Sequence, residues 1–171
     1  MDVETLVKNA KSGDENAFCE LVKINKEILY KTAYLYTKNE HDSLEILDET
    51  VYRAYVSIKK LKEDKYFNTW IMRILINRCI SYLNNRKRIE LLGINIGNLR
   101  KGSKEDKNLE DRLDLYKAID ELDGKLKVVI ILRYFQDLTV SQIADILECP
   151  IGTVKTHIHK AIKRLRIELE V

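Results

Sequence analysis

The chain of 171 residues contains one proline and six glycines, and this scarcity gives tight hairpins and extended strands little support. Its three cysteines, Cys19, Cys79 and Cys149, are odd in number and far apart, with no CxxC pair beside them. A disulfide framework and a cysteine-ligated zinc site are therefore not indicated. We expect small buried apolar residues at these positions, with Cys149 the one open to solvent.

Long apolar runs are also missing. No window approaches the roughly 20 apolar residues of a transmembrane helix, and the acidic N-terminus lacks the apolar core of a signal peptide. We therefore expect a cytoplasmic protein. The net charge is only +3, so any case for nucleic-acid binding depends on where the cations lie.

Hydrophobic residues make up 45% of the chain and charged residues 33%, as in a globular protein. Stretches rich in Leu, Ile, Lys, Glu and Ala favour helices. We predict an all-α fold of two small helical domains, residues 1–92 and 111–171, joined by a flexible linker at 93–110. The linker is predicted where apolar periodicity stops and glycine, serine, asparagine and mixed charge gather.

Four helices are predicted in the first domain, because apolar residues recur there every three or four positions. Their expected limits are Asp2 to Lys11, a cap at Asp14 to about Asn39, His41 or Asp42 to about Lys62, and a cap at Asn68 or Thr69 to about Arg88. The third helix has the strongest periodicity, with an inward set of Leu44, Leu47, Val51, Ala54, Tyr55, Ile58 and Leu61.

The fourth helix is rich in cations, and no acidic residue occurs between Lys65 and Ile89. Tyr66, Phe67 and Trp70 lead into it. Aromatic rings stack on unpaired bases while lysine and arginine hold the backbone, so this helix is a candidate for binding single-stranded nucleic acid. The alternative places the aromatic residues in the core, and for Trp70 alone we favour the core.

The stretch from Leu138 to Arg166 says most about function. It predicts one helix capped by Thr139 and a second that follows Pro150, because proline breaks one helix and can open another. No acidic residue occurs between Pro150 and Arg166. This pattern is typical of a helix-turn-helix, whose second helix lies in the DNA major groove. The alternative is an ordinary amphipathic hairpin with a solvated basic face.

With both domains placed, the chain resembles the extracytoplasmic-function (ECF) sigma factors, which keep only the second and fourth conserved regions of the sigma family. Residues 118–166 are similar to the fourth region, most tellingly in GTVK at 152–155. Residues 42–55 resemble the segment that docks on the polymerase clamp, and residues 68–79 resemble the promoter-melting helix. The chain departs from the family pattern at Asp48, Asp123, Asp137 and Glu148.

The resemblance implies a sigma factor that binds core RNA polymerase and directs promoter-specific transcription initiation at minus-ten and minus-thirty-five elements. Its implied partners are core RNA polymerase, promoter DNA and an anti-sigma factor, which in this family is often membrane-bound and would hold the protein at the membrane. The sequence has no nucleophile–base pair, phosphate-cradling glycine loop or paired metal ligands. We therefore expect no enzyme activity, small-molecule substrate, cofactor or metal.

The resemblance also implies three sites. The polymerase-binding residues are expected to be Ile46, Leu47, Asp48 and Glu49. The minus-ten element is expected to contact Lys62, Lys65, Tyr66, Phe67, Trp70, Arg73, Asn77, Arg78, Arg86 and Arg88. The minus-thirty-five element is expected to contact Thr139, Ile151, Gly152, Thr153, Lys155, Thr156, His157, His159, Lys160, Lys163 and Arg164.

One other function stays open at this point. A helix-turn-helix regulator could bind DNA without acting as a polymerase subunit, because such proteins also contain sequences like TVKTHI. A response regulator would need the alternating strands and helices of a receiver domain, and no strand pattern is present. A dimeric repressor would recognise palindromic half-sites, which gives a direct test.

Overall fold

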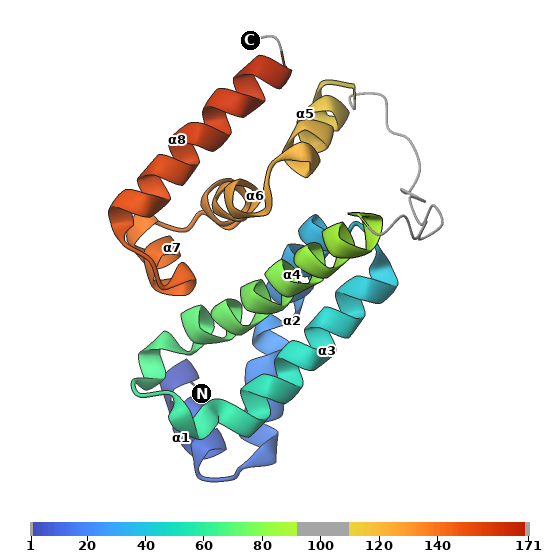
Figure 1. The fold of residues 1–171 in the computed structure, drawn as a ribbon. Helices are drawn as coiled ribbons and strands as arrows, with labels where there is room; N and C mark the ends of the chain where they lie inside the picture. The colour runs from blue at the N-terminus through green and yellow to red at the C-terminus, as the bar shows by residue number, and fades with distance from the viewer. Residues whose placement is uncertain (1, 92–109, 170–171) are drawn as a thin grey trace. The chain divides into compact units, whose positions relative to one another are not determined.

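The computed structural model describes residues 2–91 and 110–169, and these residues form helices without any strand (Figure 1). The predicted all-α class is confirmed. The chain divides into two compact units, Met1–Arg88 and Ile89–Val171. The predicted linker, 93–110, lies outside the described residues except at Glu110, where a helix begins.

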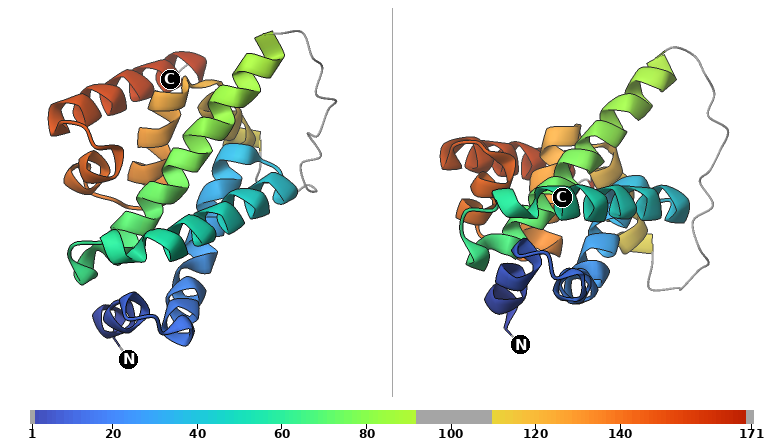
Figure 2. Two further views of the ribbon diagram at one scale, coloured as in Figure 1. Left: turned by 60° about the horizontal axis from the view of Figure 1, so that its bottom comes forward. Right: turned by 90° about the horizontal axis from the view of Figure 1, so that it is seen from below.

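The first unit contains α1 (Val3–Lys11), α2 (Glu15–Thr37), α3 (Glu40–Ser57), the 3₁₀ turns η1 (Ile58–Lys60) and η2 (Asp64–Tyr66), and α4 (Phe67–Leu91). Helices α2, α3 and α4 lie beside one another, and α1 lies at the end of this bundle where η1 and η2 are found (Figures 1 and 2). A salt bridge between Lys11 and Asp64 joins α1 to η2.

Side-chain caps define the helix starts. Asp2 accepts from the Thr5 N–H at 2.7 Å and Asp14 from the Ala17 N–H at 3.1 Å, as the sequence suggested for these helices. The predicted start of α3 at His41 or Asp42 is wrong. Asn39 is the cap, its side chain accepting from the Asp42 N–H at 2.9 Å.

The predicted inward face of α3 is partly wrong. Leu44 and Tyr55 are 42% and 49% exposed. The buried residues of this helix are instead Ser43, Ile46, Leu47, Thr50 and Ala54. Hydroxyl groups make this possible, because Ser43 donates to the Asn39 carbonyl at 2.5 Å and Thr50 to the Ile46 carbonyl at 2.7 Å. A face that includes satisfied polar groups is invisible to a search for apolar periodicity.

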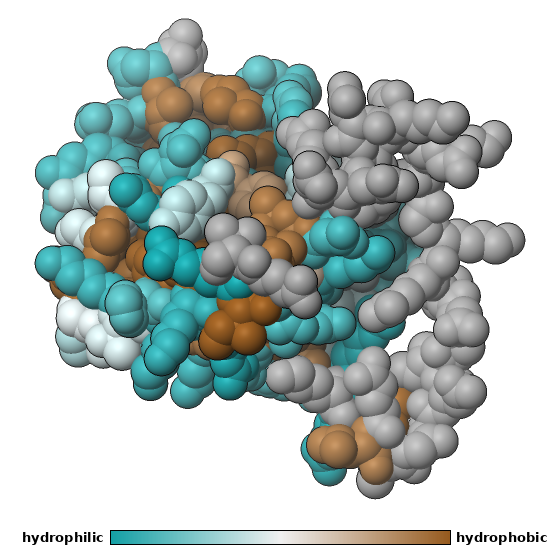
Figure 3. Space-filling model, turned by 90° about the horizontal axis from the view of Figure 1, so that it is seen from above, coloured by the Kyte–Doolittle hydropathy of each residue, from teal (hydrophilic) through white to brown (hydrophobic). Residues whose placement is uncertain are grey.

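Cysteine placement also differs from expectation. Cys79 is buried and Cys149 is half-buried, but Cys19, predicted as a buried apolar residue, is exposed on α2. On the face drawn in Figure 3, polar side chains break the apolar surface into separate patches.

The second unit contains α5 (Glu110–Glu121), α6 (Gly124–Ile130), the π-helical turn η3 (Ile131–Phe135), α7 (Val140–Leu147) and α8 (Ile151–Glu168). Its core brings α5, α6 and α8 together through Ile119, Leu122, Leu126, Ile130 and Ala161. Lys127 is only 4% exposed, and its ammonium lies 2.7 Å from the Asp120 carboxylate of α5. This ion pair satisfies a charge that burial would otherwise make costly.

Helices α7 and α8 form the predicted helix-turn-helix. Thr139 caps α7 in a capping box, accepting from the Gln142 N–H at 3.2 Å while the Gln142 side chain accepts from the Thr139 N–H at 2.9 Å. Helix α7 ends at Leu147, and the residue that caps it, Glu148, is left-handed with a φ of 52°. Helix α8 follows Pro150 as predicted. Lys38 and Asp137 are also left-handed, with φ of 53° and 50°.

Replacing Glu148 by glycine is expected to raise the free energy of unfolding by about 1 kcal/mol, because a left-handed conformation is unfavourable for residues with a Cβ. Urea unfolding followed by circular dichroism would show the shift. The matched control is Asp145→Gly inside α7, which we expect to lower stability by about 1 kcal/mol. A loss of stability in Glu148→Gly would contradict the argument.

Candidate functional site

An acidic stripe runs along the exposed side of α3. We define it as Leu44, Glu45, Asp48 and Tyr52, in which Leu44, Glu45 and Tyr52 each lie three or four residues from Asp48. Leu44 and Tyr52 are 42% and 64% exposed. Neither Glu45 nor Asp48 forms an ion pair with any described residue. The stripe therefore presents two uncompensated carboxylates beside two apolar side chains.

Two of the predicted polymerase-binding residues do not reach this surface. Ile46 and Leu47 are 7% and 3% exposed, and they pack in the core beneath the stripe. Their part in polymerase contact stays a prediction, and the structure shows that little of either side chain is open to a partner. Leu44, Glu45 and Tyr52 were missed, although their helical spacing from Asp48 was the signal that could have identified them.

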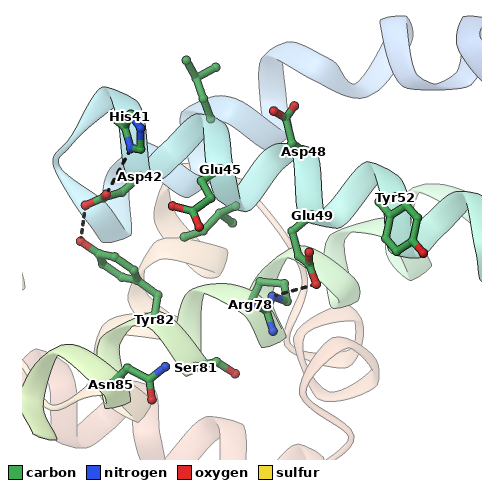
Figure 4. Close-up of a pocket in the computed structure, with 12 residues that line it drawn as sticks. His41, Asp42, Glu45, Asp48, Glu49, Tyr52, Arg78, Ser81, Tyr82 and Asn85 are labelled. Carbon is green, nitrogen blue, oxygen red and sulfur yellow. Dashed lines mark hydrogen bonds and ion pairs between the residues drawn. The ribbon is translucent and has the colours of Figure 1, made fainter.

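A groove of about 760 Å³ separates α3 from α4 (Figure 4). Its α3 side is acidic, and its α4 side contributes Arg78, Ser81, Tyr82 and Asn85. Glu49 points toward Arg78 across the groove, whereas Asp48 points away from α4 (Figure 4). Of these two adjacent carboxylates, Glu49 faces α4 and Asp48 faces outward.

Glu49 is shared between two arginines. The Arg53 Nε donates to its Oε1 at 2.5 Å, and the Arg78 Nε lies 3.9 Å from the same oxygen. Glu49 therefore presents less uncompensated charge to a partner than Asp48 does. The carboxylate that the sequence grouped with Asp48 is thus ion-paired within the first unit.

At the other end of the groove, the Tyr82 hydroxyl donates to the Asp42 carboxylate at 2.7 Å, and the Arg86 guanidinium lies 3.4 Å from the same hydroxyl. Partial burial and the Asp42 carboxylate raise the pKa of Tyr82 to about 12. This hydrogen bond fastens the start of α3 to α4.

An ultraviolet titration of the native protein should therefore show one tyrosine ionisation with a midpoint near pH 12, and this step should be missing from Tyr82→Phe. Because the folded pKa of Tyr82 exceeds the ordinary tyrosine value of 10.0, the stabilisation from this hydrogen bond is complete below pH 10 and is lost as the pH rises toward about 12. Tyr34→Phe is the control. If subtracting the Tyr34→Phe titration from the wild type gave the same difference curve as subtracting Tyr82→Phe, the assignment to Tyr82 would be contradicted.

The residues predicted to bind the minus-ten element do not share one surface. Phe67 is 0% exposed and packs against Trp70, with ring centroids 5.9 Å apart, so its ring is not open to a base in this structure. Trp70 is half-buried and is not among the buried core residues, so the structure does not decide between its two predicted roles. Asn77 is exposed on α4, whereas Arg73, Arg78 and Arg86 are half-buried and Arg88 is exposed.

The loop before α4 keeps its predicted cations at the surface. Lys62 and Lys65 are exposed, and the Lys65 ammonium lies 3.0 Å from Glu63 and 4.8 Å from the centre of the Tyr66 ring. Tyr66 is 52% exposed and is the loop aromatic accessible for stacking. Single-strand binding at this end of the unit would therefore centre on Tyr66.

In the second unit, the predicted DNA-binding residues gather on the outer side of α8. Thr153 and His157 are half-buried, and the others on this helix are exposed. Lys155, Lys160 and Lys163 form no ion pair with any described residue, so their charges are available to an anion. Thr139 lies apart, because its hydroxyl is used as the α7 cap.

The geometry does not favour a metal at the start of α3. Ligand-type atoms of His41, Asp42 and Glu45 lie within 4.8 Å of one another. However, Asp42 already accepts a hydrogen bond from Tyr82, and the positive end of the α3 dipole opposes a cation.

Among the described helices, none is long and apolar enough to cross a membrane.

Comparison with known proteins identifies the class. The family models "Sigma-70 region 2" and "Sigma-70, region 4" match residues 21–89 and 112–165, one in each unit. RNA polymerase sigma factor SigV of Bacillus subtilis (strain 168) is 34% identical over 145 residues, covering 85% of this chain and 86% of SigV. ECF RNA polymerase sigma factor SigW of the same organism is 30% identical over 182 residues, covering 99% and 97%.

Solved structures agree on the fold. CnrH in complex with the cytosolic domain of CnrY has a TM-score of 0.73 at 20% identity, covering 98% of this chain and 97% of that chain. Sigma factor RpoE in complex with the anti-sigma factor NepR from Bartonella quintana has a TM-score of 0.67 at 22% identity, covering 90% and 97%.

The two helical units and their family matches thus define an RNA polymerase sigma factor of the sigma-70 family. Within that family, the chain belongs to the ECF sigma factors. It binds core RNA polymerase and directs promoter-specific transcription initiation, which confirms the function expected from the sequence over the regulator that acts without polymerase. Sigma factors are initiation factors and not enzymes.

Proposed function

We propose that the two units divide the work of a sigma factor, with the acidic stripe of α3 binding a basic surface of core polymerase and α8 binding duplex DNA. The observation that carries this proposal is the separation of uncompensated charge. Glu45 and Asp48 have no ionic partner among the described residues, and neither do three lysines of α8. Opposite uncompensated charges on separate units suit two different partners.

The acidic stripe suits a reversible protein interface. Its carboxylates would steer a basic partner and set its register, and Leu44 and Tyr52 would supply apolar contact area. Glu49 would contribute less to binding, because Arg53 and Arg78 already compensate it. We therefore assign polymerase contact to the outward-facing residues and structural support to Ile46 and Leu47.

The minus-ten element would be bound as a single strand by the loop before α4 and the exposed side of α4. Tyr66 would stack on a base, Lys62 and Lys65 would neutralise phosphates, and Asn77 would supply a polar contact. The minus-thirty-five element would be bound as a duplex by α8, whose first turns enter the major groove while Lys160, Lys163 and Arg164 contact phosphates.

We also propose that an anti-sigma factor, itself anchored in the membrane, holds this protein inactive in the cytoplasm. Support comes from the fold neighbours, since RpoE was solved with an anti-sigma factor and CnrH with the cytosolic domain of CnrY. The acidic stripe is an available surface for such a partner, and occupying it would exclude polymerase.

Run-off transcription tests the division of labour. Purified core polymerase would be combined with this protein and genomic fragments that include the region upstream of its own gene. We expect discrete new transcripts that require both the protein and an intact duplex upstream of the start site. If core gained no initiation, yet the protein alone bound a palindromic duplex tightly, the proposal would be wrong.

A further inference from the structure

The exposed chemistry of α8 restricts which base edges it can recognise. From Ile151 to Ile167 the helix contains no Asp, Glu, Asn or Gln. Carboxylates accept from the cytosine amino group, and amides form paired hydrogen bonds with adenine. Without either, the helix is suited to acceptor-rich guanine and to the methyl group of thymine.

Thr156 lies on the exposed side of α8, one turn after Gly152. Its hydroxyl donates to the Gly152 carbonyl at 2.9 Å, so its single donor proton is already used within the helix. Because threonine is branched at Cβ, a hydroxyl directed back along the helix leaves the methyl group as the apolar part of the side chain available to a ligand.

The helix surface one turn before Thr156 is open. A Cβ added at Gly152 would meet no atom within 4 Å beyond its chain neighbours and the helix backbone, so Gly152 leaves free space on that side of α8. Ile151, at the first position of α8, is 46% exposed and adds a second apolar group at the end of the helix that would enter the groove first. Lys155 lies between them and is exposed.

We infer that Thr156 determines promoter specificity by contacting the 5-methyl group of a thymine in the minus-thirty-five duplex through its own methyl group. This inference rests on the proposed role of α8 in binding that duplex. The Thr156 hydroxyl fixes the rotamer of its side chain, and the Lys155 ammonium binds the neighbouring phosphate or a guanine edge. Specificity at this base pair then comes from apolar contact and not from a donated hydrogen bond.

Two substitutions separate the methyl group from the hydroxyl. Thr156→Ser keeps the hydroxyl and removes the methyl, whereas Thr156→Val keeps a methyl and removes the hydroxyl. Holoenzyme assembled with each variant would be titrated with promoter duplexes in which upstream thymines are replaced one at a time by deoxyuridine. This replacement deletes the 5-methyl group and leaves every hydrogen-bonding atom of the base in place.

For the wild-type protein we expect one thymine whose replacement weakens binding about fourfold, the effect of withdrawing one methyl group from an apolar contact. Thr156→Val should retain this difference. Thr156→Ser should bind the thymine duplex about fourfold more weakly and should not distinguish thymine from deoxyuridine at that position. An effect of the base change on DNA shape would persist in all three proteins, which would overturn the inference.

Discrimination retained in Thr156→Ser and lost in Thr156→Val would also overturn it, since the hydroxyl would then be the reading group. A scrambled upstream duplex provides the separate test of the proposed function. If holoenzyme bound the scrambled and natural duplexes equally, α8 would not be the duplex-binding helix. If scrambling weakened binding but no thymine methyl mattered, only the reading of the methyl group would fail.

Discussion

Reversing Glu45 and Asp48 together to lysine should weaken binding to core RNA polymerase by about a hundredfold, or roughly 3 kcal/mol. Both carboxylates lie on the exposed side of α3 and neither has an ionic partner among the described residues. The substitutions would place two positive charges opposite a basic surface without breaking any internal ion pair. Fluorescence titration of labelled protein with core would measure the loss, and run-off transcripts should disappear.

The matched control is Glu20→Lys with Glu27→Lys, which makes the same change of charge on α2. These carboxylates form only exposed pairs with Lys23 and Lys31, so the fold should tolerate their loss. We expect polymerase affinity within about twofold of the wild type. Equal weakening by both double variants would show that overall charge matters and that the acidic stripe is not a specific site.

Neutralising Lys155, Lys160 and Arg164 to glutamine should lower the affinity of holoenzyme for promoter duplex by roughly a hundredfold at moderate salt. Each cation that contacts a phosphate releases a counterion, so the slope of log affinity against log salt should become shallower by roughly three. The measurement is a salt titration of promoter binding. Affinity for core should remain unchanged, because all three residues lie outside the acidic stripe proposed to bind polymerase.

Lys125→Gln provides the control for this experiment. Lys125 is exposed in the same unit, at the start of α6, and it lies outside the helix-turn-helix. Its loss should change the salt slope by much less than one. A triple variant with an unchanged slope would show that α8 does not face the phosphates.

The helical fold and the helix-turn-helix were largely predictable from the sequence. Thr139 and Pro150 mark the starts of α7 and α8 through local backbone chemistry, which acts in the same way in every tertiary context. The inward face of α3 was not predictable in the same way. Ser43 and Thr50 are buried because their hydroxyls bond to carbonyls one turn back, and no apolar pattern reports this.

The candidate sites were predictable as regions but not residue by residue. Charge patterning identified α8 because its exposed cations need no tertiary partner. The same reasoning could not show that Glu49 is ion-paired, since one of its arginines lies on α3 and the other on α4, a distant part of the sequence. The burial of Phe67 was not predictable for a similar reason, because an aromatic residue at a helix start can be a stacking platform or a core residue according to its neighbours.

Lys38, Asp137 and Glu148 are all left-handed, and none of them is a glycine. Their combined conformational cost is about 3 kcal/mol, which corresponds to roughly a hundredfold in the ratio of unfolded to folded molecules. Proteases remove unfolded chains, so the lifetime of such a protein responds to costs of this size. Three turns outside the residues proposed here to bind polymerase or DNA can therefore influence how long each molecule persists in the cell.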